Sequence, residues 1–189
     1  MDKKVDLRTE ILLGKDLPEE VIKMMEDQRV KEYGENTKDF RNKERESTFF
    51  FLKGNDEVKA FGVLKPVNLY CEAQSYPIMG ITNVIAVEKS KGWGKVLMKQ
   101  ITEYLERNKI PGMGNTYSGN FEFYKKCGYT FVPDLLQRMV YVKDNEEEVR
   151  TETRTEEGED YSMFIYDSQN ILKDVVEGNK RVVIKVPFW

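Results

Sequence analysis

Histidine is absent from the 189-residue chain. Its absence excludes Ser-His-Asp and Cys-His catalytic triads and most zinc sites, so an acid or base must be a carboxylate, Tyr, Lys, Cys, a chain terminus or an ordered water. Cysteine is scarce too: Cys71 and Cys127 form no CxxC pair. Two cysteines cannot build a disulfide framework, and we expect both to be reduced thiols. No metal site is expected.

Long apolar runs and a strong charge of one sign are also missing. No stretch approaches 18 apolar residues and the N-terminal sequence is charged, so we expect neither a membrane span nor a signal peptide. Thirty basic and 33 acidic residues give a net charge of −3, which does not favour a nucleic-acid partner. With 40% hydrophobic and 33% charged residues, the composition is typical of one folded cytoplasmic domain.

The order of the predicted elements indicates a mixed α/β fold. The first helix follows Asp16, ends at Gly34 and carries apolar residues at Val21, Ile22, Met25 and Val30. An apolar run at 78–87 is typical of a buried central strand, and a strongly amphipathic helix follows it. A short helix is expected at 121–126. The other expected strands are 9–13, 48–52, 58–64, 129–132 and 138–142.

The last part of the chain has a different composition. Residues 143–160 contain nine acidic and three basic residues and are expected to form a solvated linker. Beyond them we predict strands at 163–166 and 182–186 with a helix at 168–177 between them. These elements are too few to fold alone. We therefore assign residues 1–142 to a core and 143–189 to an extension packed on the same domain.

The segment Lys89-Ser90-Lys91-Gly92-Trp93-Gly94 connects the apolar strand to the amphipathic helix. Glycines at the start of a helix allow backbone N–H groups to approach an anion, and the helix dipole favours negative charge there. The spacing matches neither a Walker loop nor a dinucleotide fingerprint. By itself, the segment is a weak signal and favours a structural turn over an anion site.

Two motifs together resemble the GNAT superfamily of N-acetyltransferases. Lys89, Gly92 and Gly94 occupy the marked positions of its coenzyme A loop, Gln/Arg-x-x-Gly-x-Gly/Ala, with Lys in place of Gln or Arg. About thirty residues later, the sequence Phe-Tyr-Lys-Lys-Cys-Gly-Tyr at 123–129 is similar to the family signature Phe-Tyr-x-x-x-Gly-Phe. The resemblance covers residues 8–142. It implies a twisted mixed sheet flanked by helices, here with a C-terminal strand–helix–strand addition.

The resemblance also implies a role for individual residues. The backbone of Ile85 and Val87 would pair with the pantetheine of acetyl-CoA, beside a bulge where the strand splays from its neighbour. Tyr124 would protonate the departing thiolate, although packing in the core is its alternative role. Trp93 would cover the cofactor or pack on the helix. The amides that would hold the pyrophosphate belong to Ser90, Lys91, Gly92, Trp93, Gly94 and Lys95.

Three positions depart from the family pattern. The loop is short if the apolar run is strand throughout; otherwise the strand ends at Val84. A carboxylate that relays the amine proton in the family aligns with Asn83, which cannot be a base; we assign it to acceptor binding, with hydrogen bonding at the strand edge as the alternative. The family's Asn after the fifth strand falls at Tyr117. Residues 153–165 and the terminal Trp189 resemble the extension of aminoglycoside 2′-N-acetyltransferases, so Trp189 is expected in the acceptor pocket, with capping of the hydrophobic core as its alternative role.

The function implied is transfer of an acetyl group from acetyl-CoA to a primary amine of a small molecule, with an aminoglycoside as one acceptor class. The amine would attack the thioester directly, without a metal. The alternative is a non-catalytic CoA-binding or protein-interaction module on the same fold. A second copy of the chain, as in a homodimer, is an optional partner; nucleic acid and membrane are not expected.

Overall fold

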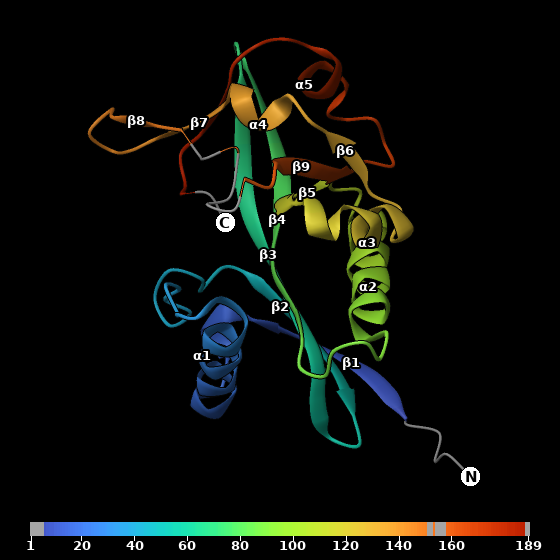
Figure 1. The fold of residues 1–189 in the computed structure, drawn as a ribbon. Coiled ribbons are helices and arrows are strands. Elements are labelled where there is room, and N and C mark those ends of the chain that lie inside the picture. The colour runs from blue at the N-terminus through green and yellow to red at the C-terminus, as the bar shows by residue number, and fades with distance from the viewer. Residues whose placement is uncertain (1–5, 151–152, 154–157, 188–189) are drawn as a thin grey trace. The chain divides into compact units, whose positions relative to one another are not determined.

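A computed structural model describes residues 6–150, 153 and 158–187 of the protein. The chain forms two compact units (Figure 1). Unit 1 comprises residues 1–65 and 82–101, and unit 2 comprises residues 66–81 and 102–189. The elements that run through both units are β3 (Glu57–Cys71), β4 (Gln74–Ala86) and α2 (Trp93–Asn108). Each unit contains a hydrophobic cluster of its own.

Unit 1 is built on a three-stranded antiparallel sheet. Strand β2 (Thr48–Gly54) lies between β1 (Leu7–Leu13) and β3. The turn η1 (Gly14–Asp16) and helix α1 (Glu19–Tyr33) follow β1 in the chain. Aromatic residues of β2 and β3 are fully buried because they pack with the apolar side of α1. This cluster includes Ile22, Met25, Phe40, Phe49, Phe51, Phe61, Val63 and Ile85.

Helix α1 departs from its predicted pattern at one position. Ile22 and Met25 are buried as expected, but the prediction was wrong for Val30, whose exposed fraction is 48%. Arg29 is buried in its place, with 7% exposed. The reason is helical geometry: residues 22, 25 and 29 lie within about 60° of one another around the axis, whereas residue 30 is turned away. The helix ends at Gly34, which has φ +80° and donates its N–H to Val30 O (2.9 Å).

Unit 2 holds the other part of the mixed sheet, in the order β6-β9-β5-β4-β3-β10-β7-β8. The pairs β4–β5 and β10–β7 are parallel, whereas β9 is antiparallel to both of its neighbours. The remaining elements are β5 (Gly112–Tyr117), η2 (Ser118–Asn120), α3 (Phe121–Lys126), β6 (Thr130–Val132), α4 (Leu135–Arg138), β7 (Met139–Val142), β8 (Glu148–Val149), β9 (Tyr161–Tyr166), α5 (Lys173–Glu177) and β10 (Val182–Ile184).

The C-terminal addition is the predicted strand–helix–strand, and both of its strands are internal to the sheet. Strand β9 is inserted between β5 and β6, and β10 between β3 and β7. Helix α5 is shorter than predicted and begins at Lys173. Gly114 of β5 makes the insertion of β9 sterically possible, because a Cβ atom there would lie 2.4 Å from the Phe164 ring.

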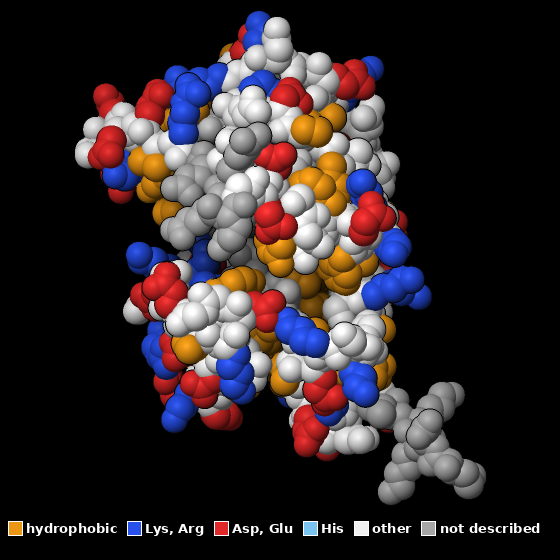
Figure 2. All heavy atoms as spheres, in the orientation of Figure 1, with side chains coloured by type: hydrophobic (Ala, Val, Ile, Leu, Met, Phe, Trp, Pro, Cys, Tyr) orange, Lys and Arg blue, Asp and Glu red, His pale blue; other side chains and the backbone are white. Residues whose placement is uncertain are grey.

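The described surface agrees with the balanced composition. Basic and acidic side chains are interspersed over the visible face (Figure 2). Among the described residues, no helix is both long and apolar enough to cross a bilayer. Within the same residues, no group of three or more Cys, Asp or Glu side chains is arranged to hold a metal ion.

Candidate functional site

The C-terminal end of β4 is irregular at Asn83. This residue has φ +51° within the strand, a left-handed conformation that interrupts the pleat. β4 ends at Ala86, so the strand does not stop at Val84 and the loop before α2 is short. The ladder between β4 and β5 consists of two residue pairs, Met79 with Gly112 and Gly80 with Met113.

The backbone of β4 near its end directs alternate residues to opposite edges. The Val87 N–H donates to Lys59 O of β3 (2.9 Å) and is therefore not available to a ligand. A pantetheine contact of the Val87 backbone would therefore have to use its carbonyl oxygen, and it stays a prediction. In a regular strand, residues two apart face the same edge, so Ile85 also faces β3, and Val84 and Ala86 face the opposite edge.

The loop before α2 has an unusual backbone. Ser90 has φ +61° and Gly92 has φ +79°. The first N–H groups bonded at this end of the helix belong to Lys95 and Val96, which both donate to Gly92 O (3.1 and 3.2 Å). Within the described chain, the N–H groups from Ser90 to Gly94 make no hydrogen bond. Unpaired amides before a 16-residue helix are suited to a phosphate group, so this loop fits the pyrophosphate of CoA.

Trp93 is the first residue of α2 and is half-buried. Its Nε1–H is buried, and no acceptor for it exists in the described structure. A buried donor without a partner is unfavourable by about 1–3 kcal/mol, so such a group commonly marks an absent ligand or water. This orphaned donor beside the unpaired amides is a second feature that fits a bound group rich in acceptor oxygens.

The lysines of the loop differ in their partners. Lys89, at the position of the family's Gln or Arg, forms an ion pair with Glu32 of α1. Lys91 and Lys95 are exposed. Exposed ion pairs contribute little to stability, so Lys89 is not fixed strongly in this position. Lys91 and Lys95 therefore add positive charge near the loop and do not determine its conformation.

Asn83, predicted to bind the acceptor, is 7% exposed. Its Oδ1 accepts a hydrogen bond from Arg29 Nη1 of α1, and its Nδ2 donates to Thr82 Oγ1 (3.2 Å). Sequence analysis did not single out Arg29. The signal was its position, because a charged residue seven after Ile22 and four after Met25 falls on the apolar face of the helix.

Tyr124 lies in unit 2, on α3, and is 8% exposed. Its ring stacks on Phe164 of β9, with 3.9 Å between centroids, and meets Tyr129 edge-to-face at 6.1 Å. Strand β9 of the extension therefore fixes the plane of the Tyr124 ring. Trp189 lies outside the described residues, as do residues 154–157 of the segment compared with the aminoglycoside enzymes.

Comparison with solved structures identifies the fold. Escherichia coli ElaA matches with a TM-score of 0.60 and 14% identity over 86% of this chain and 100% of ElaA. An acyl-CoA N-acyltransferase from Pseudomonas aeruginosa matches with a TM-score of 0.55 and 13% identity, over 85% of this chain and 99% of that protein. A conserved protein of unknown function from Enterococcus faecalis V583 matches with a TM-score of 0.56 and 17% identity over 67% of this chain. The present chain spans only 33% of that protein's length.

The chain has the GNAT fold. No family model and no curated protein matches it in sequence. With identities of 13–17% to the three structures, the similarity establishes the GNAT fold and leaves activity to be argued from the site.

Proposed function

We propose that this GNAT-fold protein is an acetyl-CoA-dependent N-acetyltransferase acting on a primary amine of a small molecule. The run of unpaired amides from Ser90 to Gly94, after the interrupted end of β4, is the observation on which the proposal chiefly depends. The orphaned Trp93 Nε1–H supports it. Amides of Ser90–Gly94 would hold the pyrophosphate, whereas the Lys95 N–H predicted to join them is bonded to Gly92 O, and the backbone of Val84 and Ala86 would pair with pantetheine.

In the proposed reaction, acetyl-CoA supplies an activated acetyl group as a thioester. The neutral amine nitrogen forms a bond to the carbonyl carbon, and the carbon–sulfur bond breaks. Tyr124 donates its phenolic proton to the departing sulfur, the proton lost by the amine passes to solvent, and solvent returns one proton to the Tyr124 phenolate. Phenol and thiol have similar ordinary acidities, so this proton transfer is close to balanced.

Acetyl-CoA binding and turnover test the proposal separately. A ligand that binds only the folded state stabilises it by about 2.7 kcal/mol at a concentration of roughly 100 times its Kd. We expect acetyl-CoA to raise the Tm, and CoA thiol to be released when amino acids, polyamines, aminoglycosides or peptides are added. A Tm shift without thiol release from any amine would favour the non-catalytic CoA-binding module.

The non-catalytic alternative is favoured by one observation. Asn83 stands where the GNAT pattern has a carboxylate, and its side-chain oxygen is held by Arg29. An amide cannot accept the amine proton. The direct mechanism above avoids this difficulty because the acceptor enters as the neutral amine.

Trp189 stays a proposed acceptor-pocket residue, and deleting residues 188–189 should raise the acceptor KM while the acetyl-CoA Tm shift persists.

A further inference from the structure

Arg29 of unit 1 is a buried cation held by neutral groups. Its Nε donates to Asn36 Oδ1 (3.0 Å), its Nη1 donates to Asn83 Oδ1, and its guanidinium lies 4.9 Å from the centre of the Tyr33 ring. Within the described residues, no carboxylate forms an ion pair with it. Its Nη2 has no hydrogen bond there and is not a buried unpaired atom, so this donor is open to solvent.

A buried guanidinium without a counter-ion is unfavourable. Burial lowers the pKa of Arg29, and the charges of Tyr33 and Glu35, neither of which forms an ion pair with it, oppose the shift; an arginine side chain remains charged in proteins. Removing a charge from water costs several kcal/mol unless an opposite charge compensates for it. The two asparagine oxygens satisfy two donors and provide no negative charge.

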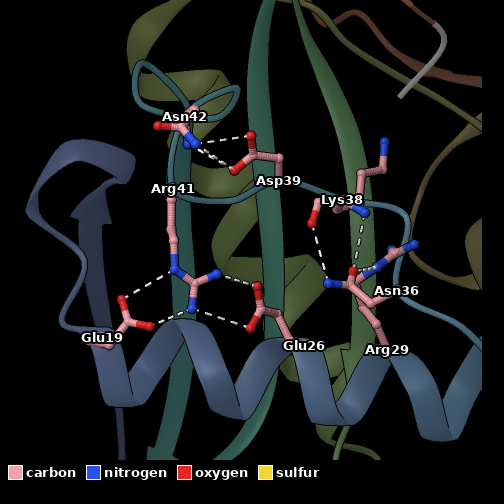
Figure 3. Close-up of polar contacts among 8 residues, drawn as sticks. All are labelled: Glu19, Glu26, Arg29, Asn36, Lys38, Asp39, Arg41 and Asn42. Carbon is pink, nitrogen blue, oxygen red and sulfur yellow. Dashed lines mark hydrogen bonds and ion pairs between the residues drawn. The ribbon is translucent and has the colours of Figure 1, made fainter.

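Arg41 shows that carboxylates are available nearby. It forms ion pairs with Glu19 and Glu26 of the same helix that carries Arg29 (Figure 3). Arg29 instead contacts Asn36 in the same view. Acidic residues are therefore available on α1, but they pair with Arg41 and not with Arg29. Of the two arginines, Arg29 is the one that can bind a negatively charged ligand.

A second cation lies beside Arg29. Asn36 accepts from the Lys38 N–H (3.1 Å) and donates to Lys38 O (3.2 Å), so one asparagine holds both residues. Lys38 is half-buried, and burial lowers its pKa, with Lys65 and Arg29 adding to the effect and Glu44 opposing it. Glu44 is already bonded to Lys65 Nζ (2.9 Å) and Ser47 Oγ (2.6 Å). Lys38 is therefore close to two other cations, Arg29 and Lys65, and the carboxylate near it is already paired with Lys65.

We propose that the Arg29 cluster, comprising Arg29, Lys38 and Asn36, binds a carboxylate of the amine acceptor, so the acceptor is an amino acid or a similar amino-carboxylate. This inference rests on the proposed acetyltransferase function. A planar guanidinium offers paired donors to a carboxylate, and Lys38 adds a point charge. CoA phosphate is the less suitable anion because Arg29 bonds Asn83, which precedes the proposed pantetheine residues, whereas the phosphate loop follows them.

The test compares acids with matched amides and does not depend on turnover. N-acetyl forms of the twenty amino acids and their carboxamides are added to the full chain, and Tm and Kd are measured. We expect at least one acid to bind about 10- to 100-fold more tightly than its amide. Arg29→Gln should abolish that preference, and Arg29→Lys should retain part of it. The acetyl-CoA Tm shift should persist in both variants.

Arg41→Gln is the matched control, since it removes an arginine already neutralised by Glu19 and Glu26 and should leave the acid preference unchanged. Equal binding of acids and amides by the wild-type chain would overturn the inference, whether or not the Arg29 variants fold. If amines without a carboxylate release thiol equally well, the acetyltransferase function survives and the inference fails. Acid binding that Arg29→Gln abolishes, without thiol release, supports the cluster and contradicts the function.

Discussion

Two arginines near α1 differ in what neutralises them, and this difference separates a structural residue from a functional candidate. Arg41 is bound to two glutamates and is partly exposed, with 39% of its side chain accessible. Arg29 is buried against amide oxygens and a tyrosine ring. At the scale of single residues, a charge that the fold leaves uncompensated is the clearest sign that the protein awaits a ligand.

For Tyr124, we predict that Tyr124→Phe lowers kcat by roughly 100-fold or more while the Kd for acetyl-CoA stays nearly constant. The phenylalanine ring can keep the stacking on Phe164, so the Tm should change little. Steady-state kinetics and a binding titration measure the two effects. Tyr129→Phe is the control, because Tyr129 is also a buried tyrosine of unit 2, its hydroxyl bonds Thr102, and it has no proposed part in the reaction. Equal kcat values for wild type and Tyr124→Phe would assign Tyr124 to packing.

At the scale of elements, the loop before α2 depends on the left-handed conformation of Gly92. A Cβ atom there would meet nothing within 4 Å, so a side chain is disfavoured by the backbone angle rather than by crowding. The loss in unfolding free energy expected for Gly92→Val is roughly 1–3 kcal/mol. We also predict that this variant loses most of the Tm shift with acetyl-CoA.

Gly34→Val provides the control for the loop. Gly34 has φ +80° and open space around a Cβ atom, but it ends α1 and is not part of the loop. The two variants should lose similar stability without ligand, and only Gly92→Val should lose the response to acetyl-CoA. A normal acetyl-CoA shift in Gly92→Val would place the pyrophosphate elsewhere.

Local patterns predicted some of these elements well and others not at all. The helix 93–108 and the strand before it could be read from periodicity, because each buries a continuous set of apolar side chains. The left-handed conformation of Asn83 could not be predicted in this way. The sheet imposes it, and an asparagine in an apolar run does not indicate it. The burial of Arg29 was missed because the apolar Val30 beside it seemed the natural member of the helix face.

At the scale of the whole molecule, the C-terminal extension completes the sheet. Its core contribution consists of Met163, Ile165, Leu172, Val175, Val182 and Ile184. We predict that a chain ending at Val142 does not fold, because the strands between β5 and β6 and between β3 and β7 would be missing. Circular dichroism and urea unfolding check this, and a cooperative transition in the shortened chain would make residues 1–142 an independent core.

The free energy of unfolding at alkaline pH gives a second prediction for the molecule. Burial raises the pKa of Tyr129 well above its usual range. Above pH 10 the unfolded state loses this proton while the folded state keeps it, so the unfolded state binds fewer protons and the free energy of unfolding falls as pH rises. Urea unfolding between pH 9 and 11.5 should show a smaller fall in Tyr129→Phe than in wild type. Parallel curves would contradict the assignment.

Acetyl transfer is measured by the CoA thiol that is released from acetyl-CoA in the presence of an amine. With the free amino acids as acceptors, the account predicts release that requires both the amine and the folded chain, yields the N-acetyl acid in equal amount, and falls roughly 100-fold in Tyr124→Phe. Stabilisation by acetyl-CoA with no amine-dependent thiol release from amino acids, polyamines, aminoglycosides or peptides would contradict it.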